Sequence, residues 1–204
     1  MTVLEFVFQN RVATVIKMTA TLMCRIQRAE LGYLISGADL DSDEPLDAVQ
    51  TSIRSLAERK SATTDFDTLL RGNVSFGALI ERYGFDAVPS PKYHGPGAGN
   101  PFFSGGYLTR EHGSVNGGKV DAIQIESARS FREPSTRGRY AKSLACALRD
   151  YVCMHYFSDE EPYPPGCTDD YQSFCSGQPR TFWQLPAIMW PLILISSPVI
   201  NACF

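Results

Sequence analysis

The chain lacks the sequence patterns that mark the commonest metal, nucleotide and serine-nucleophile sites. Its 204 residues include only three histidines, and none of them belongs to an HxxE or HExxH pattern. GxSxG and P-loop patterns are absent as well, so nothing supports those two classes of enzyme. No CxxC pair occurs, which argues against a structural zinc site. The sequence by itself therefore predicts no metal ligands.

An excess of positive charge is also missing. The chain has 19 Lys and Arg against 22 Asp and Glu, which gives a net charge of -3. A domain that binds nucleic acid is usually basic, so we expect no nucleic-acid partner. Hydrophobic residues make up 44% of the chain and charged residues 20%, a balance that permits a globular core. The length suits a single domain.

The two ends of the chain differ in composition from the part between them. Residues 182–204 carry no charged side chain over about the length of a membrane span, but Pro186, Pro191 and Pro198 interrupt them. Because proline disrupts the backbone bonding of a spanning helix, we expect no membrane partner, and a tether at Phe182–Phe204 is kept as an alternative. No basic segment opens the chain, so no secretory signal is predicted. We divide the chain into an atypical segment 1–25, a domain 26–158, and an irregular and hydrophobic tail 159–204.

The six cysteines show no spacing typical of a disulfide framework. This favours a reduced protein in the cytoplasm. Cys146 and Cys153 are seven residues apart, which places them on one face of a helix and predicts thiols in the core. The full set is Cys24, Cys146, Cys153, Cys167, Cys175 and Cys203.

Strand and helix patterns alternate along the middle of the chain. The apolar run 31–36 predicts a strand, and residues 120–126 predict another with apolar side chains on both faces. Helical spacing predicts one amphipathic helix or two short ones from Pro45 to about residue 60. It also predicts helices from Ser75 to Tyr83 and from Pro134 to about Met154. These elements indicate an α/β class with a mixed, mostly parallel sheet flanked by helices.

The segment 90–119 is rich in glycine and proline and predicts a long loop. Long irregular loops in compact domains are more often functional than idle. This loop contains Arg110, whose planar guanidinium suits recognition of carboxylates, and His112, which can move a proton or bind a metal. The alternative is that both are solvated loop residues. His94 is a weaker candidate, and His155 is expected only to end a helix.

Glu126 is the strongest candidate for chemistry, because it stands where the strand 120–126 ends. Sites in open α/β sheets lie at the carboxyl ends of strands, and a carboxylate there suits a general base. The alternative is an ion pair with Arg129 or Arg132 that serves stability alone.

Several segments, in this order, resemble the N-formylglutamate amidohydrolase family. They are QRAELGYLISGADL, TSIRSLAERK, SFGALIERYGFDAVPSP, NPFFSGGYLTREHGS and GGKVDAIQIESARSFRE. The segment RGRYAKSLACALRDYV is similar to the closing helix of the family. The similarity covers roughly Ile26 to His155. Its most specific part is the loop SGGYxTxxHGS followed by the strand VDAIQIE.

The resemblance implies a fold, a reaction and roles for residues. It implies a carboxypeptidase- and aspartoacylase-like α/β/α sandwich around a mixed sheet. It also implies a zinc-dependent hydrolase that cleaves the amide bond of N-formylglutamate or of related N-acyl acidic amino acids, with a small acidic amide as its partner. Glu126 matches the general base of the family. Arg129 and Arg132 would hold a substrate carboxylate or fix Glu126, and Arg110 and His112 would line the same pocket.

The chain departs from the family pattern before the region of similarity. The PHxG-type metal motif, the Arg-Asp-x-Asn-Arg segment and the DxHGH-like strand have no counterpart, and no histidine precedes Arg25. We therefore expect a partial domain with an incomplete sheet, a fragmentary gene model, and no zinc held by the ligands of the family. The alternative function is that of a catalytically inactive binding relative, which retains Arg110, Arg129 and Arg132 as a pocket for acidic ligands.

Overall fold

The computed structural model describes residues 27–158 together with Cys167 and Cys175. In this part of the chain a three-stranded sheet has the order β2-β1-β3, with β1 at Ala29–Gly32, β2 at Ala87–Val88 and β3 at Gln124–Glu126. β2 is parallel to β1, whereas β3 is antiparallel to it. The predicted α/β class with a mixed sheet is confirmed. The expectation that the sheet is mostly parallel is wrong for the described strands, because one of the two pairings is antiparallel.

The register of β1 and β3 gives the sheet one apolar and one polar face. Leu31 is paired with Ile125, and Glu30 is paired with Glu126. Side chains directly opposite each other in a ladder project to the same side, and successive residues alternate between sides. Leu31 and Ile125 are buried in the hydrophobic core, so the two glutamates project from the opposite face.

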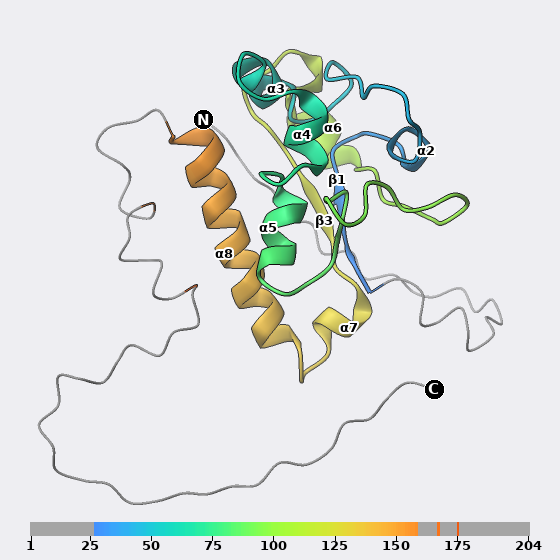
Figure 1. The fold of residues 1–204 in the computed structure, drawn as a ribbon, viewed down its shortest axis with the longest axis vertical. Coiled ribbons are helices and arrows are strands. Elements are labelled where there is room, and N and C mark those ends of the chain that lie inside the picture. Colours follow the sequence, from blue (N-terminus) through green and yellow to red (C-terminus); the bar gives the residue numbers. More distant parts are fainter. Residues whose placement is uncertain (1–26, 159–166, 168–174, 176–204) are drawn as a thin grey trace, which may run out of the picture.

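Two helices cover the apolar face. Figure 1 shows α5 (Phe76–Arg82) and α8 (Arg137–Tyr156) side by side on one side of β1 and β3, with α2 (Gly37–Leu40) on the other side. The core-facing stripe of α8 includes the buried residues Tyr140, Ala147 and Tyr151. The ring of Tyr151 packs against that of Phe76 on α5, with 5.3 Å between the centroids. This packing joins the two helices of the layer to each other.

The remaining helices are short and lie at the two ends of the sheet. In Figure 1, α3, α4 and α6 lie near one end, and α7 lies at the other, where it leads into α8. Their bounds are α3 (Arg54–Lys60), α4 (Phe66–Arg71), α6 (Tyr107–His112), η1 (Ser114–Asn116) and α7 (Arg129–Arg132).

The structure confirms two predicted helices. The Ser75 side chain accepts a hydrogen bond from the backbone N–H of Ala78, so it caps α5 as expected. Gly84, just after this helix, has φ +89°, the left-handed conformation that favours glycine. The last predicted helix is α8, which begins at Arg137 and ends at Tyr156.

Two other predicted elements are shorter than expected. The helix expected from Pro45 exists only as α3, because residues 51 and 52 are tied to Tyr33: the Thr51 hydroxyl and the Ser52 N–H both donate to its carbonyl. The strand expected over 120–126 is reduced to β3, because Ala122 exchanges two hydrogen bonds with Ser52 instead of joining the sheet. Tertiary contacts of residues 51–52 therefore override both local patterns.

The cysteines of α8 are oxidised, which corrects the expectation of reduced core thiols. Cys146 is bonded to Cys175, and Cys153 is bonded to Cys167. Both bonds attach residues beyond 158 to α8. The segment 1–25 and the proposed tether Phe182–Phe204 lie outside the described residues. Among the described helices, none is both long and apolar enough to cross a membrane.

Candidate functional site

The candidate site is the polar face of the sheet, formed by Glu30 and Gly32 of β1 and by Gln124 and Glu126 of β3. Glu30 is paired with Glu126, and Gly32 is paired with Gln124. All four residues share one face because they alternate with the core residues of the same strands.

Glu126 is half-buried, and one of its oxygens is held by a neighbour. The Gln124 amide Nε2 donates to Glu126 Oε1 over 2.9 Å, and Gln124 is itself only 4% exposed. No described residue is hydrogen-bonded to the second carboxylate oxygen of Glu126. The carboxylate is thus oriented through one oxygen, while the other is left for a water or a substrate.

The Gly-rich loop SGGY lies directly on this polar face. A Cβ on Gly32 would stand 2.6 Å from the backbone N of Gly105, and a Cβ on Gly106 would stand 2.9 Å from Gln124 Oε1. The backbone of the loop leaves no room for a side chain at Gly32, whereas a side chain at Gly106 would have to displace the Gln124 amide. The backbone N–H of Phe103 also donates to Glu30 Oε2 over 2.9 Å. The structure therefore brings together the two most specific motifs of the sequence, the SGGY loop and the QIE strand.

The conformation of this loop is fixed from both sides. Thr109 Oγ1 accepts from the Gly106 N–H over 2.8 Å and donates to the Gly106 carbonyl over 3.0 Å. Gly105 has φ +128°, which a residue with a side chain rarely adopts. Leu34 has φ +68°, and its N–H donates to the Ser104 carbonyl. A left-handed leucine costs on the order of 1 kcal/mol, and strain of this kind concentrates at functional sites.

Arg110 and His112 lie on α6, the helix that follows the SGGY loop. Both side chains are exposed, and neither has an ion pair or a hydrogen bond to a described residue. They are available to an acidic ligand, but the structure does not bring either of them into contact with Glu126.

Arg129 and Arg132 lie on α7, just after β3. Arg129 is 90% exposed and forms an ion pair with Glu133 over 3.3 Å. Arg132 is exposed and lines a groove between α7 and α8. Glu126 therefore takes Gln124 as its described partner, and the alternative of an ion pair with Arg129 or Arg132 is not seen.

The described part of the chain shows no cluster of metal-ligating side chains. Within the described ranges, no group of three or more His, Cys, Asp or Glu side chains could hold a metal ion. His94 and His112 are exposed. His155 is buried in the last turn of α8 with Nε2 2.8 Å from the Val74 carbonyl, and burial lowers its pKa. His155 thus lies at the end of a helix, as expected.

Gln124 and Glu30 are site residues that the sequence did not single out. Gln124 could have been found, because it stands two residues before Glu126 and so shares its face of the strand. Glu30 could not, because its position depends on how two strands far apart in the sequence align. That register is visible only in the folded chain.

Asp121 anchors the stretch that leads into β3. It is fully buried, and it accepts hydrogen bonds from Ser114 Oγ over 2.6 Å and from the Tyr156 hydroxyl over 3.0 Å. Burial raises the pKa of Asp121, although these donors act in the opposite direction. Asp121 therefore positions the strand of the candidate site from outside the site itself.

Comparison of the chain with protein-family models, with curated proteins and with solved structures yields no match.

Proposed function

We propose that this chain acts on the amide bond of N-formylglutamate or a related N-acyl acidic amino acid, with Glu126 as the general base. One observation carries the proposal: the SGGY loop contacts Gln124 beside Glu126, on the polar face of the sheet. These two motifs are the most specific part of the sequence resemblance to N-formylglutamate amidohydrolases.

The chemistry assigned to Glu126 is the removal of a proton from water. Gln124 holds one carboxylate oxygen, so the other can accept this proton as the water oxygen bonds to the amide carbon. The carbon–nitrogen bond then breaks, and the proton passes to the leaving amine. The exposed cations Arg110, Arg132 and His112 are the proposed partners of the substrate carboxylates, together with Arg129. The described residues include no group of side chains that could hold zinc, so no step is assigned to a metal.

A second candidate function is favoured by the exposure of Arg110, Arg129 and Arg132. In this reading the chain is a binding relative without catalytic activity. It would use Arg110, Arg129 and Arg132 to hold a small dicarboxylate. Arg129 would then exchange its exposed partner Glu133 for the ligand.

Hydrolysis of N-formylglutamate, measured with and without added zinc, tests the first proposal. Glu126→Gln is expected to lower the turnover number at least 100-fold while ligand affinity is retained, because an amide cannot accept the proton. The matched control is Glu111→Gln, an exposed acid on α6, which should leave turnover unchanged.

The same preparation separates the two candidates. If there is no turnover but N-formylglutamate raises the melting temperature, the binding function is correct and the hydrolase is not. If there is neither turnover nor a shift in melting temperature, both proposals fail.

The predicted cytoplasmic location rested on reduced cysteines. The bonds of Cys146 and Cys153 remove that support, because disulfides persist mainly in oxidising compartments. We propose that the compartment be determined directly, by locating the tagged full chain in cells. Recovery in the cytosol with these four cysteines reduced would restore the original prediction.

A further inference from the structure

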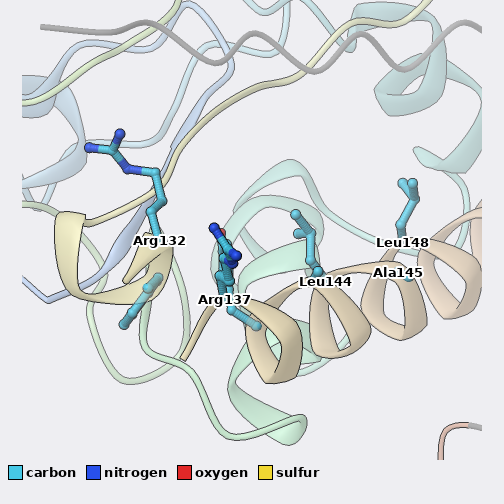
Figure 2. Close-up of a pocket in the computed structure, with 8 residues that line it drawn as sticks. Arg132, Arg137, Leu144, Ala145 and Leu148 are labelled. Carbon is cyan, nitrogen blue, oxygen red and sulfur yellow. The ribbon is translucent and has the colours of Figure 1, made fainter. Parts of the chain in front are cut away.

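An apolar groove separates α7 from the first half of α8. It has a volume of about 490 Å³, and its walls include Phe131, Tyr140, Leu144, Ala145 and Leu148. Figure 2 shows Leu144 and Leu148 projecting from the same side of α8. The volume lies in the range of small-molecule pockets, and the lining is almost wholly apolar. We call this feature the α7–α8 groove.

The floor of the groove is preformed. The rings of Phe131 and Tyr140 lie 4.9 Å apart, and each packs edge-on against Phe85. The Tyr140 hydroxyl is 2.9 Å from Ser127 Oγ, so the polar end of this ring already has a partner. The aromatic floor is therefore already packed, with Phe131 6% and Tyr140 4% exposed. The lining that a ligand can reach consists mainly of Ala141, Ala145 and Leu148.

One end of the groove is positively charged. Arg137 stands at the start of α8 and Arg132 comes from α7, both at the end opposite Leu148 (Figure 2). Both side chains are exposed, and neither side chain has an ion pair or a hydrogen bond to a described residue. The surrounding segment 129–142 carries five basic residues and one acid, whereas the whole chain has a net charge of -3. The positive charge is thus local to this end.

We propose that the α7–α8 groove binds a monomeric anionic amphiphile, a single alkyl chain with a terminal carboxylate. The headgroup lies at Arg132 and Arg137, where two guanidiniums without described partners can pair with it. The alkyl chain runs along α8 past Leu144 to Leu148, over roughly 16 Å of helix from Arg137. A concave groove fits a single chain better than the flat surface of a bilayer. The proposal shares Arg132 with the proposed function, but the groove lining and Arg137 belong to it alone, so it does not require hydrolysis.

The test is titration of the full chain with decanoate, followed by calorimetry and by the backbone NMR signals of α8. We expect binding with shifts confined to α7 and to α8 up to about Leu148. Arg132→Gln and Arg137→Gln should each weaken decanoate binding about tenfold or more, since each removes one charged partner. Arg82→Gln, an exposed arginine on α5, is the matched control and should change nothing.

Neutral and short probes make the test decisive. The neutral 1-decanol and the short anion butyrate should both bind more weakly than decanoate, because each lacks one half of the recognised chemistry. The proposal is overturned if decanol binds as well as decanoate, or if the arginine variants bind decanoate normally. It is also overturned if the chain binds phosphatidylserine vesicles but does not bind decanoate below the critical micelle concentration of decanoate. The proposal is overturned too if sedimentation shows a dimer of the chain whose interface covers the groove.

Discussion

At the scale of single residues, Asp121 shows how one buried carboxylate organises several segments. Its two oxygens accept from Ser114 of η1 and from Tyr156 at the end of α8, while its own backbone leads into β3. The side chain is inaccessible to solvent, so the ionised form depends on these donors. Stability is therefore expected to respond to pH and to the loss of a single hydroxyl.

The free energy of unfolding should fall as pH rises through the interval between the ordinary aspartate pKa and the raised pKa of Asp121. The folded state binds this proton more tightly than the unfolded chain does, so the free energy of unfolding decreases with increasing pH in this interval. Above the raised pKa the free energy of unfolding no longer depends on this group. Ser114→Ala removes a donor to the ionised form. It should extend the interval upward and lower stability at neutral pH by about 2 kcal/mol.

Urea unfolding of both proteins between pH 4 and pH 8 measures this effect. Ser61→Ala, an exposed serine after α3, serves as the control and should follow the native profile. An unchanged pH profile in Ser114→Ala would show that the hydrogen bond to Asp121 does not stabilise the carboxylate.

At the scale of elements, the position of α5 depends on a glycine. A Cβ on Gly77 would stand 2.0 Å from the Pro89 carbonyl oxygen and 2.9 Å from Ser90 Cβ. The helix therefore approaches the chain beyond β2 to backbone contact. Gly138, in the first turn of α8, has open space where its Cβ would be.

Gly77→Ala and Gly138→Ala form a matched pair of helical substitutions. Alanine is the better helix former by about 1 kcal/mol, so Gly138→Ala should raise the free energy of unfolding by up to that amount. Gly77→Ala should instead lower it by about 2 kcal/mol or more, because the added methyl group displaces α5 from residues 89–90. Chemical unfolding measures both changes. If the free energy of unfolding increased in both variants, the close packing at Gly77 would be refuted.

The N-caps of α4 and α5 provide a second matched pair. Asp65 accepts from the Thr68 N–H over 2.8 Å in an exposed position, whereas Ser75 accepts from the Ala78 N–H over 3.1 Å and is fully buried. Each change to alanine should cost about 1 kcal/mol. We expect the larger loss for Ser75→Ala, because Ser75 is fully buried whereas Asp65 is exposed.

Thermal unfolding of the two capping variants ranks these losses. A greater loss for Asp65→Ala would mean that exposure of the cap does not control its contribution to stability.

The sequence predicts the elements whose ends carry local signals. Ser75 and Gly84 bracket α5, and the apolar stripe of α8 repeats at helical spacing, so both helices were predicted with small errors at their ends. The helical prediction from Pro45 holds only from Arg54 onward, because Thr51 and Ser52 bind Tyr33, a contact that no local pattern encodes. The candidate site likewise contains one residue that a local pattern predicts and one that it does not. Glu126 was predicted from its place after an apolar run, whereas its neighbour Glu30 depends on the strand register.

At the scale of the whole molecule, two disulfides connect α8 to residues outside the main described range. They close loops with sequence separations of 29 and 14 residues. Loops of these lengths stabilise the folded state by about 3–4 kcal/mol each in the chain-entropy model. Oxidation is thus expected to make a large contribution to the stability of α8.

Reduction with dithiothreitol should lower the melting temperature, and Cys146→Ser with Cys175→Ser should reproduce part of the loss without reductant. Peptide mapping of the unreduced chain is expected to link Cys146 to Cys175 and Cys153 to Cys167. Fragments that join Cys146 to Cys167 would contradict the pairing in the structure.

The register that places Glu30 opposite Glu126 also sets the order of events during synthesis. β1 leaves the ribosome long before β3 exists, and at about 5–20 residues per second the intervening chain takes on the order of ten seconds to make. During that interval Leu31 has no Ile125 to pair with, and one edge of β1 is open to any other extended chain. The nascent protein is therefore most exposed to aggregation while the segment between β1 and β3 is being made. A chaperone that binds extended apolar segments would be most useful in that interval.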